Sequence, residues 1–499
     1  MSKLIINTDL GRQKISRHIY GHFAEHLGRC VYEGVWVGED SPIPNTRGIR
    51  NDVVQALRKL NMPNLRWPGG CFADTYHWRH GVGPRQQRAS IINVHWGGVC
   101  ENNHFGTHEF FDLCEMLSTP AGRCEPYICG NVGSGTVQEM AEWLEYITMP
   151  GDSPMARLRR LHGRDQPWDV TFWAVGNENW GCGGHMTAQQ YAWEYRRYQT
   201  YCRHFGGRDR RLYKVACGYD DAWNEVLVRE CHRFMDGISI HHYSLPTIQW
   251  SAKKGSATKF SVEEWASTLR AAYNVEPMLA RTAAILDRHD SLHRIGIVLD
   301  EWGTWYDVEP GTEPGFLYQQ NTIRDALVAG LTLNILNTWS HRVHMANIAQ
   351  TINVLQAMVL TDREKMLLTP TYHVFEMYKS HQDATLLPSH LECDDYTLGA
   401  HTMPQISASA SRDEHGRMHI SLCNVHHEKP VELTCELRGG ASAPAVAAGR
   451  ILAAATMNAH NTFENPDAVK PARFTAFKTH GATVTIALPP RSVVVLDIE

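Results

Sequence analysis

Several features of membrane-spanning, exported and disulfide-rich proteins are missing from this sequence. No apolar run approaches the roughly 20 residues of a membrane-spanning helix. The N-terminal stretch MSKLIINTDLGRQK has no apolar segment long enough for an export signal. The 13 cysteines are scattered without a C-x-x-C pair. We therefore expect a cytoplasmic protein with reduced thiols and no disulfide framework, and we expect no metal or cofactor.

The sequence also has no excess of positive charge. Its 48 Lys and Arg residues stand against 53 Asp and Glu residues, which gives a formal net charge of −5. This balance predicts no nucleic-acid partner and no anionic membrane surface. Tryptophan and histidine are abundant instead, with 15 and 28 copies. Both side chains are common where sugars or metals bind.

Short apolar strands alternate with helical patterns over residues 16–382. Helix starts are indicated by Thr136, Thr187 and Ser261, each followed three residues later by Glu or Gln. No Gly-rich phosphate turn follows the first strand, so a closed (β/α)8 barrel of the α/β class is favoured over an open sheet. The expected strands are residues 18–23, 64–70, 125–133, 170–178, 212–220, 237–244, 294–302 and 345–350.

The pattern changes beyond residue 382. All 15 tryptophans lie at or before Trp339, and residues 383–499 alternate between apolar and polar side chains. This alternation predicts a C-terminal antiparallel β-sandwich, jelly-roll-like, to which residues 1–15 are expected to contribute strands. The run GGASAPAVAAG, residues 439–449, is expected to be a loop.

Two glutamates stand where a barrel carries its catalytic groups. Glu178 ends the fourth expected strand and Glu301 ends the seventh, so both belong at the C-terminal mouth of the barrel on facing sides. Two carboxylates across a cavity are what cleavage of a glycosidic bond requires. The aromatic neighbours Trp180, Trp302 and Trp305 strengthen this interpretation.

The sequence resembles the α-L-arabinofuranosidases of glycoside hydrolase family 51, and the resemblance spans residues 19–471. It implies an intracellular, retaining, exo-acting clan A enzyme that releases terminal arabinofuranosyl residues from arabino- and arabinoxylo-oligosaccharides. It also implies a barrel with a C-terminal β-sandwich, and a homohexamer. The matching segments are IYGHFAEHLGRCVYEGVW, LRWPGGCFADTYHWRHGVGP, WAVGNENWGCGG, SIHHYS, DEWGTWY, NIAQTINVLQ and AHNTFENPDAVKP.

The resemblance assigns Glu178 as general acid/base and Glu301 as nucleophile, with carboxyl groups roughly 5 Å apart. Asn177 resembles the donor to the sugar 2-hydroxyl. Arg66 resembles the arginine that keeps the nucleophile ionised, and Tyr243 is expected to hydrogen-bond the same carboxylate.

Other residues are expected to bind the sugar. Glu25 and Gln350 resemble residues that hold the furanose hydroxyls, and Trp96 and Trp305 are expected to form pocket walls. Cys71 stands where many family members carry Asn. Because a thiol is a poor donor, either the backbone N–H replaces the Asn contact or the contact is weaker here.

Three alternatives stay open. His22, Glu25 and His26 match the H-x-x-E-H pattern of zinc metallopeptidases, although Gly21 and Gly28 leave little room for a helix. A β-xylosidase or endo-β-glucanase of the same clan would share both carboxylates. A sugar-binding protein without activity is expected to have lost one of them.

Overall fold

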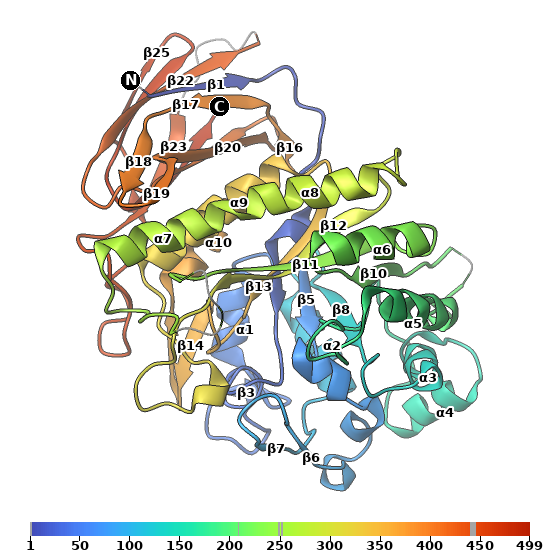
Figure 1. The fold of residues 1–499 in the computed structure, drawn as a ribbon. Coiled ribbons are helices and arrows are strands. Elements are labelled where there is room, and N and C mark those ends of the chain that lie inside the picture. Colours follow the sequence, from blue (N-terminus) through green and yellow to red (C-terminus); the bar gives the residue numbers. More distant parts are fainter. Residues whose placement is uncertain (1, 208, 248–249, 251–252, 440–445) are drawn as a thin grey trace.

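Eight parallel strands form the closed barrel of this protein, which confirms the expected (β/α)8 architecture (Figure 1). The computed structural model describes residues 2–207, 209–247, 250, 253–439 and 446–499. Each strand pairs with its neighbours in chain order, and the last pairs with the first. The strands are β2 (Gly21–Phe23), β5 (Asn64–Trp67), β8 (Glu125–Gly130), β9 (Phe172–Val175), β10 (Tyr213–Cys217), β11 (Gly237–Ser244), β12 (Gly296–Thr304) and β13 (Val343–Ala349).

Helices follow every barrel strand. The three expected starts are confirmed: the side chains of Thr136, Thr187 and Ser261 each accept a hydrogen bond from the N–H three residues later. These bonds satisfy backbone donors that a first helical turn leaves unpaired. The helices are α1 (Asn51–Arg58), α2 (Thr107–Leu117), α3 (Val137–Thr148), α4 (Pro154–Leu161), α5 (Ala188–Tyr201), α6 (Asp221–Cys231), α7 (Val262–Tyr273), α8 (Val275–Asp287), α9 (Ile323–Thr338) and α10 (Pro370–Tyr378).

Two packed sheets form the second part of the molecule, and both chain ends lie there (Figure 1). The first sheet has the order β17 (Ser389–Glu392), β1 (Ser2–Asn7), β22 (Val431–Arg438), β26 (Thr483–Leu488) and β25 (Phe477–His480). The second has the order β16 (Thr385–Leu386), β20 (Ile406–Arg412), β21 (Met418–Asn424), β27 (Ser492–Ile498), β23 (Val446–Ala453) and β24 (Ala472–Arg473).

One strand pair in this sandwich differs from the expected antiparallel pattern. Strand β1 runs antiparallel to β17 but parallel to β22, because it inserts between two strands from the other end of the chain. In the expected loop 439–449, residues 440–445 lie outside the described residues. Residues 446–449 belong to β23.

Helix α9 joins the barrel to the sandwich. It is buried along nearly its whole length, because it packs on α7, α10 and β12 of the barrel and on β20, β21 and β27 of the sandwich. Its polar residues bond to the sandwich: Asn334 Nδ2 donates to Ser407 and Asn337 Nδ2 donates to Ser409. A buried amide needs such partners, so this helix fixes the two parts of the protein against each other.

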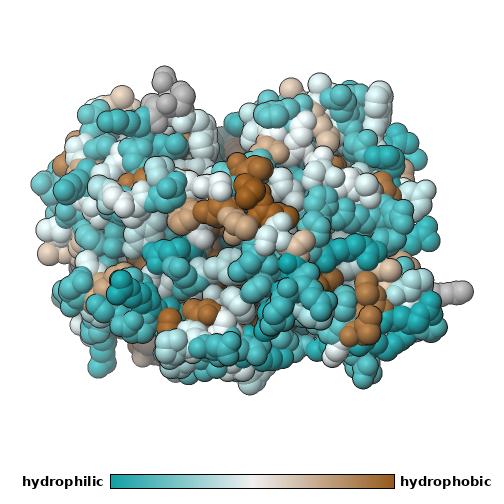
Figure 2. Space-filling view, turned by 90° about the horizontal axis from the view of Figure 1, so that it is seen from below, coloured by the Kyte–Doolittle hydropathy of each residue, from teal (hydrophilic) through white to brown (hydrophobic). Residues whose placement is uncertain are grey.

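Four short hairpins complete the described chain: β3 (Asn45–Thr46) with β4 (Ile49–Arg50), β6 (Ile91–Ile92) with β7 (Cys100–Glu101), β14 (Val359–Asp362) with β15 (Lys365–Leu368), and β18 (Asp395–Leu398) with β19 (His401–Pro404). Hydrophilic residues cover most of the face at the β6–β7 end of the molecule, and apolar residues gather there in a compact patch (Figure 2). Among the described residues, no helix is both long and apolar enough to cross a bilayer.

Candidate active site

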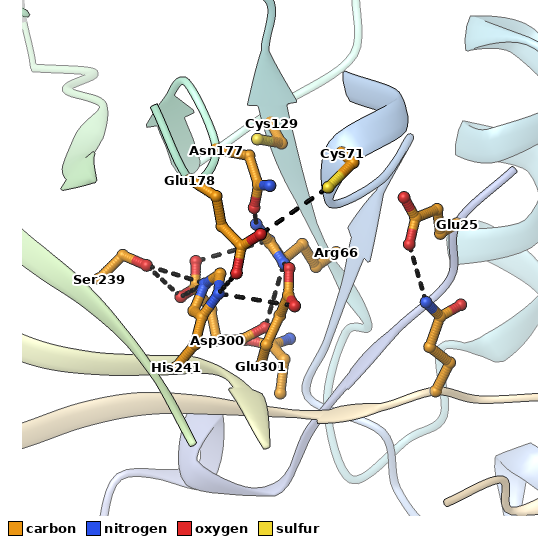
Figure 3. A network of polar contacts seen from close by, with 12 residues as sticks. Glu25, Arg66, Cys71, Cys129, Asn177, Glu178, Ser239, His241, Asp300 and Glu301 are labelled. Atoms are coloured by element: carbon orange, nitrogen blue, oxygen red, sulfur yellow. Dashed lines mark hydrogen bonds and ion pairs between the residues drawn. The ribbon is translucent and has the colours of Figure 1, made fainter. Parts of the chain in front are cut away.

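A cavity of about 470 Å³ lies at the C-terminal ends of the barrel strands. Loops bring together side chains that are far apart in the sequence, and Figure 3 shows the polar network at its floor. Arg66 and Asn177 belong to this network (Figure 3). The other sequence-predicted site residues all line the cavity: Glu25, Cys71, Trp96, Glu178, Tyr243, Glu301, Trp305 and Gln350.

Glu178 sits in a tight turn directly after β9. Its φ of 42° is left-handed, a conformation that costs a residue with a Cβ about 1–3 kcal/mol. The N–H groups of Gly181 and Gly183 both donate to the Glu178 carbonyl oxygen, at 2.7 and 3.1 Å. A Cβ on Gly176 would lie 2.1 Å from Asn179 Oδ1, so the turn requires glycine there. The G-N-E motif therefore aims the Glu178 side chain into the cavity.

Glu301 projects from β12 and is held by two donors. Arg66 Nη1 on β5 donates to Glu301 Oε1 at 2.8 Å, and the Tyr243 hydroxyl on β11 donates to Oε2 at 2.9 Å. A Cβ on Gly70 would lie only 3.1 Å from Glu301 Oε1. The glycine leaves room for the carboxylate. The two donors, one to each carboxylate oxygen, fix the orientation of the group.

His241 on β11 connects the two glutamates. Its Nδ1 lies 2.9 Å from Glu178 Oε1 and 3.5 Å from Glu301 Oε2. Burial would lower the pKa of His241, but the charge of Glu301 and bonds to Asp300 and Glu178 raise it to about 10. A carboxylate oxygen of each glutamate and a ring nitrogen of His241 all lie within 4.8 Å of one another. A protonated imidazole thus separates two acidic groups that face one cavity.

Asp300 also points into the barrel and contacts the same two cations as Glu301, because a register shift in β12 between Leu299 and Trp302 interrupts the alternation of side chains. It accepts hydrogen bonds from Ser239 and from the Tyr127 hydroxyl, and it lies within 3.5 Å of Arg66 and His241. Burial alone would raise the pKa of Asp300. The charge of Arg66 and the bond from His241 hold it well below the usual range instead. We interpret this carboxylate as the fixed counterion of the two cations.

Glu25 closes another side of the cavity. Its carboxylate accepts bonds from Phe72 N, Trp96 Nε1 and Gln350 Nε2 at 3.1, 2.9 and 2.8 Å. Burial and the charge of Glu301 raise the pKa of Glu25 to about 7, against the lowering effect of these donors. The group can therefore change charge near neutral pH.

Asn177 presents an amide to the cavity floor. Its Oδ1 accepts from Arg66 Nη2 at 2.6 Å, which fixes the amide orientation. Its Nδ2 has only a sulfur, Cys182 Sγ, at 3.9 Å as a partner among the described residues. The Nδ2 group is therefore a buried donor with only this weak acceptor.

Aromatic side chains form the cavity walls. Trp305 packs edge-on against Tyr243, and on another side Trp180 stacks on Tyr219 with ring centroids 3.9 Å apart. Trp302, which is also a sequence neighbour of Glu301, does not line the cavity. Trp302 is 1% exposed and stacks on Phe375, because neighbouring side chains on a strand point to opposite faces.

Cys71 is not a free thiol. This corrects the expectation that all cysteines are reduced and the expectation that a thiol stands at position 71. It forms a disulfide with Cys182, 111 residues later, while the other eleven cysteines are free. The expectation of fully reduced cysteines is wrong because loops after β5 and β9 meet at the barrel mouth, whatever their spacing in the sequence. Cys71 lines the cavity, but without a hydrogen on sulfur it cannot donate to a bound sugar.

The H-x-x-E-H segment does not form a metal site. His22 lies on strand β2 and is fully buried against Phe375, while Glu25 points into the cavity. Within the described ranges, neither of the two groups of potential metal ligands contains His22 or His26. The metallopeptidase alternative needs both histidines on one helical face, and this segment has no helix.

Sequence reasoning missed His241 and Cys182. His241 lies two residues before Tyr243 on one strand, so strand alternation places both on the same face and could have identified it. Cys182 carries no comparable signal, because its pairing depends on two loops. The cavity also takes apolar wall residues from loops, among them Leu27, Leu317 and Leu355.

Family models match both parts of the chain. A model described as α-L-arabinofuranosidase 1 domain matches residues 56–259, and one described as α-L-arabinofuranosidase C-terminal domain matches residues 300–492. A protein of Bacteroides ovatus named intracellular exo-α-L-arabinofuranosidase is 49% identical over 99% of this chain and 95% of its own length.

Solved structures agree with the sequence matches. The family 51 arabinofuranosidase of Xanthomonas axonopodis pv. citri superimposes with a TM-score of 0.96 at 45% identity, covering 100% of this chain and 99% of its own. The α-L-arabinofuranosidase of Thermotoga maritima, solved as an arabinose complex, gives a TM-score of 0.87 at 31% identity. It covers 100% of this chain and 99% of its own.

Proposed function

This chain belongs to the α-L-arabinofuranosidases of glycoside hydrolase family 51, and we propose that it removes terminal α-L-arabinofuranosyl residues from arabino- and arabinoxylo-oligosaccharides with retention of configuration. The observation that carries this proposal is the pair Glu178 and Glu301, whose oxygens lie within 4.8 Å across His241. Retaining glycosidases place their carboxyl groups about 5–5.5 Å apart, which is compatible with this upper limit, whereas inverting enzymes need room for a water between the two groups.

In the first step, Glu301 attacks the anomeric carbon while Glu178 protonates the leaving oxygen. The new bond joins the sugar to Glu301, and the glycosidic bond breaks with release of the aglycone alcohol. The donors Arg66 and Tyr243 hold the Glu301 carboxylate in position for the attack.

In the second step, Glu178 takes a proton from water, and the oxygen of that water displaces Glu301 from the sugar. Free arabinofuranose leaves with its original anomeric configuration, and both carboxyl groups return to their starting protonation. Consumption of the Glu301 charge in the first step helps Glu178 to change from acid to base.

The remaining groups fit the sugar-binding roles. Glu25 is placed to accept bonds from furanose hydroxyls, and Gln350 and Trp96 fix its position. Asn177 Nδ2 is placed to donate to the 2-hydroxyl, a contact that stabilises the transition state when it tightens there. Closure of the cavity at Glu25 supports exo action on one terminal ring.

The proposed domain boundaries are residues 16–382 for the barrel and 383–499 with 1–15 for the sandwich. The pairing of β1 with β17 and β22 supports this division.

An intracellular location is supported by the name of the Bacteroides relative. A homohexamer stays a prediction from the family resemblance, and light scattering of the purified protein will measure its mass.

Assays with matched substrates test the function. We expect hydrolysis of p-nitrophenyl α-L-arabinofuranoside and release of arabinose from arabino-oligosaccharides one residue at a time. NMR should show the α-anomer as the first product. Preferred cleavage of p-nitrophenyl β-D-xyloside or internal cleavage of a β-glucan would favour the same-clan alternative, and binding without turnover would favour a sugar-binding protein.

Tyr243→Phe should lower kcat. The substitution removes one hydrogen bond to the charged Glu301, worth about 1.5–3 kcal/mol, which corresponds to about a 10- to 150-fold loss. Steady-state rates with p-nitrophenyl α-L-arabinofuranoside measure it, and Tyr201→Phe, at the exposed end of α5, is the control. A rate equal to that of the wild type would exclude a role of Tyr243 on the nucleophile.

The KM of the wild type should rise as the pH falls through about 7. Protonation of Glu25 removes an acceptor for sugar hydroxyls, and its pKa of about 7 places the change there. Glu25→Gln should show a KM higher by about tenfold at pH 8 and little change between pH 8 and 6. If the variant keeps the pH dependence of the wild type, another group causes it.

A further inference from the structure

We propose that the Cys71–Cys182 disulfide is a positioning element for Glu178, so that its reduction by a dithiol slows cleavage wherever the leaving oxygen needs a proton. This inference rests on the proposed function of Glu178 as the acid. It goes beyond that function because it makes the activity depend on the redox state of two cysteines, one of which, Cys71, lines the cavity.

The disulfide touches the carboxyl group directly. Cys71 Sγ lies 3.7 Å and Cys182 Sγ 3.5 Å from Glu178 Oε2. In Figure 3, Glu178 lies between Cys71 and His241. Since neither sulfur carries a hydrogen, the disulfide packs against this oxygen without donating to it. The other oxygen, Oε1, contacts His241.

The disulfide also ties down the turn that carries Glu178. Cys71 begins the short 3₁₀ helix η2 (Cys71–Thr75), and Cys182 lies in the turn after β9. One hydrogen bond makes a second link between the same segments, from Asn177 N to Asp74 Oδ2 at 3.0 Å. A left-handed residue such as Glu178 persists only when its surroundings enforce it, and a covalent bond is the stronger of these two links.

Reduction changes both the link and the contact. The S–S bond breaks, each cysteine gains a proton, and the two electrons come from a dithiol that is itself oxidised to a disulfide. The two thiols then separate to van der Waals distance and can donate weak hydrogen bonds to Glu178.

The location makes this bond accessible to a reductant. Both cysteines are half-buried and Cys71 lines the cavity, whereas nine of the eleven free cysteines are buried. A relative of this chain is named intracellular, and dithiols keep most intracellular cysteines reduced. The enzyme would then be more active on oligosaccharides under oxidising than under reducing conditions.

A series of leaving groups separates positioning of the acid from a general loss of structure. Oxidised and dithiothreitol-reduced wild-type enzyme are compared on phenyl, p-nitrophenyl and 2,4-dinitrophenyl α-L-arabinofuranosides and on an arabino-oligosaccharide. Reduction should lower kcat/KM about tenfold or more for the phenyl substrate and the oligosaccharide, which need protonation. The 2,4-dinitrophenyl substrate needs none and should change less than about twofold.

Variants serve as matched controls. The double variant Cys71→Ser/Cys182→Ser should show the kcat/KM values of the reduced enzyme, and dithiothreitol should not change them. Cys100→Ser removes an exposed free thiol, and its kcat/KM values should respond to dithiothreitol as those of the wild type do. If the double variant does not fold, the wild-type comparison decides by itself. Peptide mapping of the oxidised protein must show the 71–182 link.

Three results would overturn the inference: equal rates in both redox states, an equal loss for every leaving group, or a peptide map without the link. In each of these cases the arabinofuranosidase activity itself remains, so the proposed function stands. Absence of hydrolysis of every arabinofuranoside in both redox states would instead reject the proposed function, and the inference with it.

Discussion

Glu301→Ala is expected to lose kcat for p-nitrophenyl α-L-arabinofuranoside by about 10⁴-fold or more, as removal of a covalent nucleophile does in other enzymes. Glu301 is the carboxylate that Arg66 and Tyr243 hold at the cavity, and alanine leaves nothing to form the sugar ester. Glu178→Ala should lose less, about 10²- to 10⁴-fold, because p-nitrophenolate leaves with little help from an acid.

Azide distinguishes the two roles. In Glu301→Ala it fills the space of the carboxylate and attacks the intact substrate, which gives a glycosyl azide of inverted configuration. In Glu178→Ala the sugar ester on Glu301 still forms, and azide then displaces it to give the retained configuration. NMR of the products measures the anomeric configuration of the glycosyl azide in each variant.

Glu432→Ala, on the exposed side of β22, controls for changes in overall charge and should retain wild-type rates. The assigned roles would be contradicted if the configurations were exchanged. Equal losses in both glutamate variants without any azide product would contradict them too.

Arg66→Met should lower both activity and stability. The guanidinium is 1% exposed and bonds to Glu301 Oε1, to the Asp300 carbonyl oxygen and to Asn177 Oδ1, at 2.8, 3.2 and 2.6 Å. Removal of one partner from a buried ion pair costs about 3–5 kcal/mol. We expect that loss in the free energy of unfolding at pH 7, and a fall in kcat of about 100-fold or more because Glu301 loses its cation.

The stability loss in Arg66→Met should depend on pH in one direction. In the wild type, burial would raise the pKa of Asp300, but the charge of Arg66, together with His241 and the hydrogen bond from Ser239, holds it below its usual range. A lowered carboxyl pKa stabilises the fold above the unfolded value of about 3.9, and this stabilisation is lost as the pH falls through the folded value. The difference between wild type and variant should therefore be largest at neutral pH and shrink below about pH 4.

Urea unfolding at several pH values measures this difference. Arg66→Lys keeps the charge without the planar fork and should fall between the wild type and Arg66→Met. A stability difference that is small, or that does not change with pH, would show that Arg66 does not compensate Asp300.

The sequence by itself determined the barrel and the place of its two acidic groups. Strand and helix patterns repeat locally, and a carboxylate at the end of a barrel strand must lie at the mouth, so Glu178 and Glu301 could be placed without coordinates. The same alternation along β11 puts His241 and Tyr243 on one face, and along β12 it turns Trp302 away from the cavity. Strand alternation by itself therefore predicts both of these orientations.

Tertiary structure alone decided the Cys71–Cys182 pair, the insertion of β1 beside β22, and the charge of His241. Each depends on segments more than 50 residues apart in the chain, and no local pattern records which loops meet. The raised pKa of His241 in particular arises from three carboxylates on two segments: Glu301 and Asp300 on β12, and Glu178 in the turn after β9. Spacing along the chain sets which groups stand at the barrel mouth, but only distance in space sets how their charges act on one another.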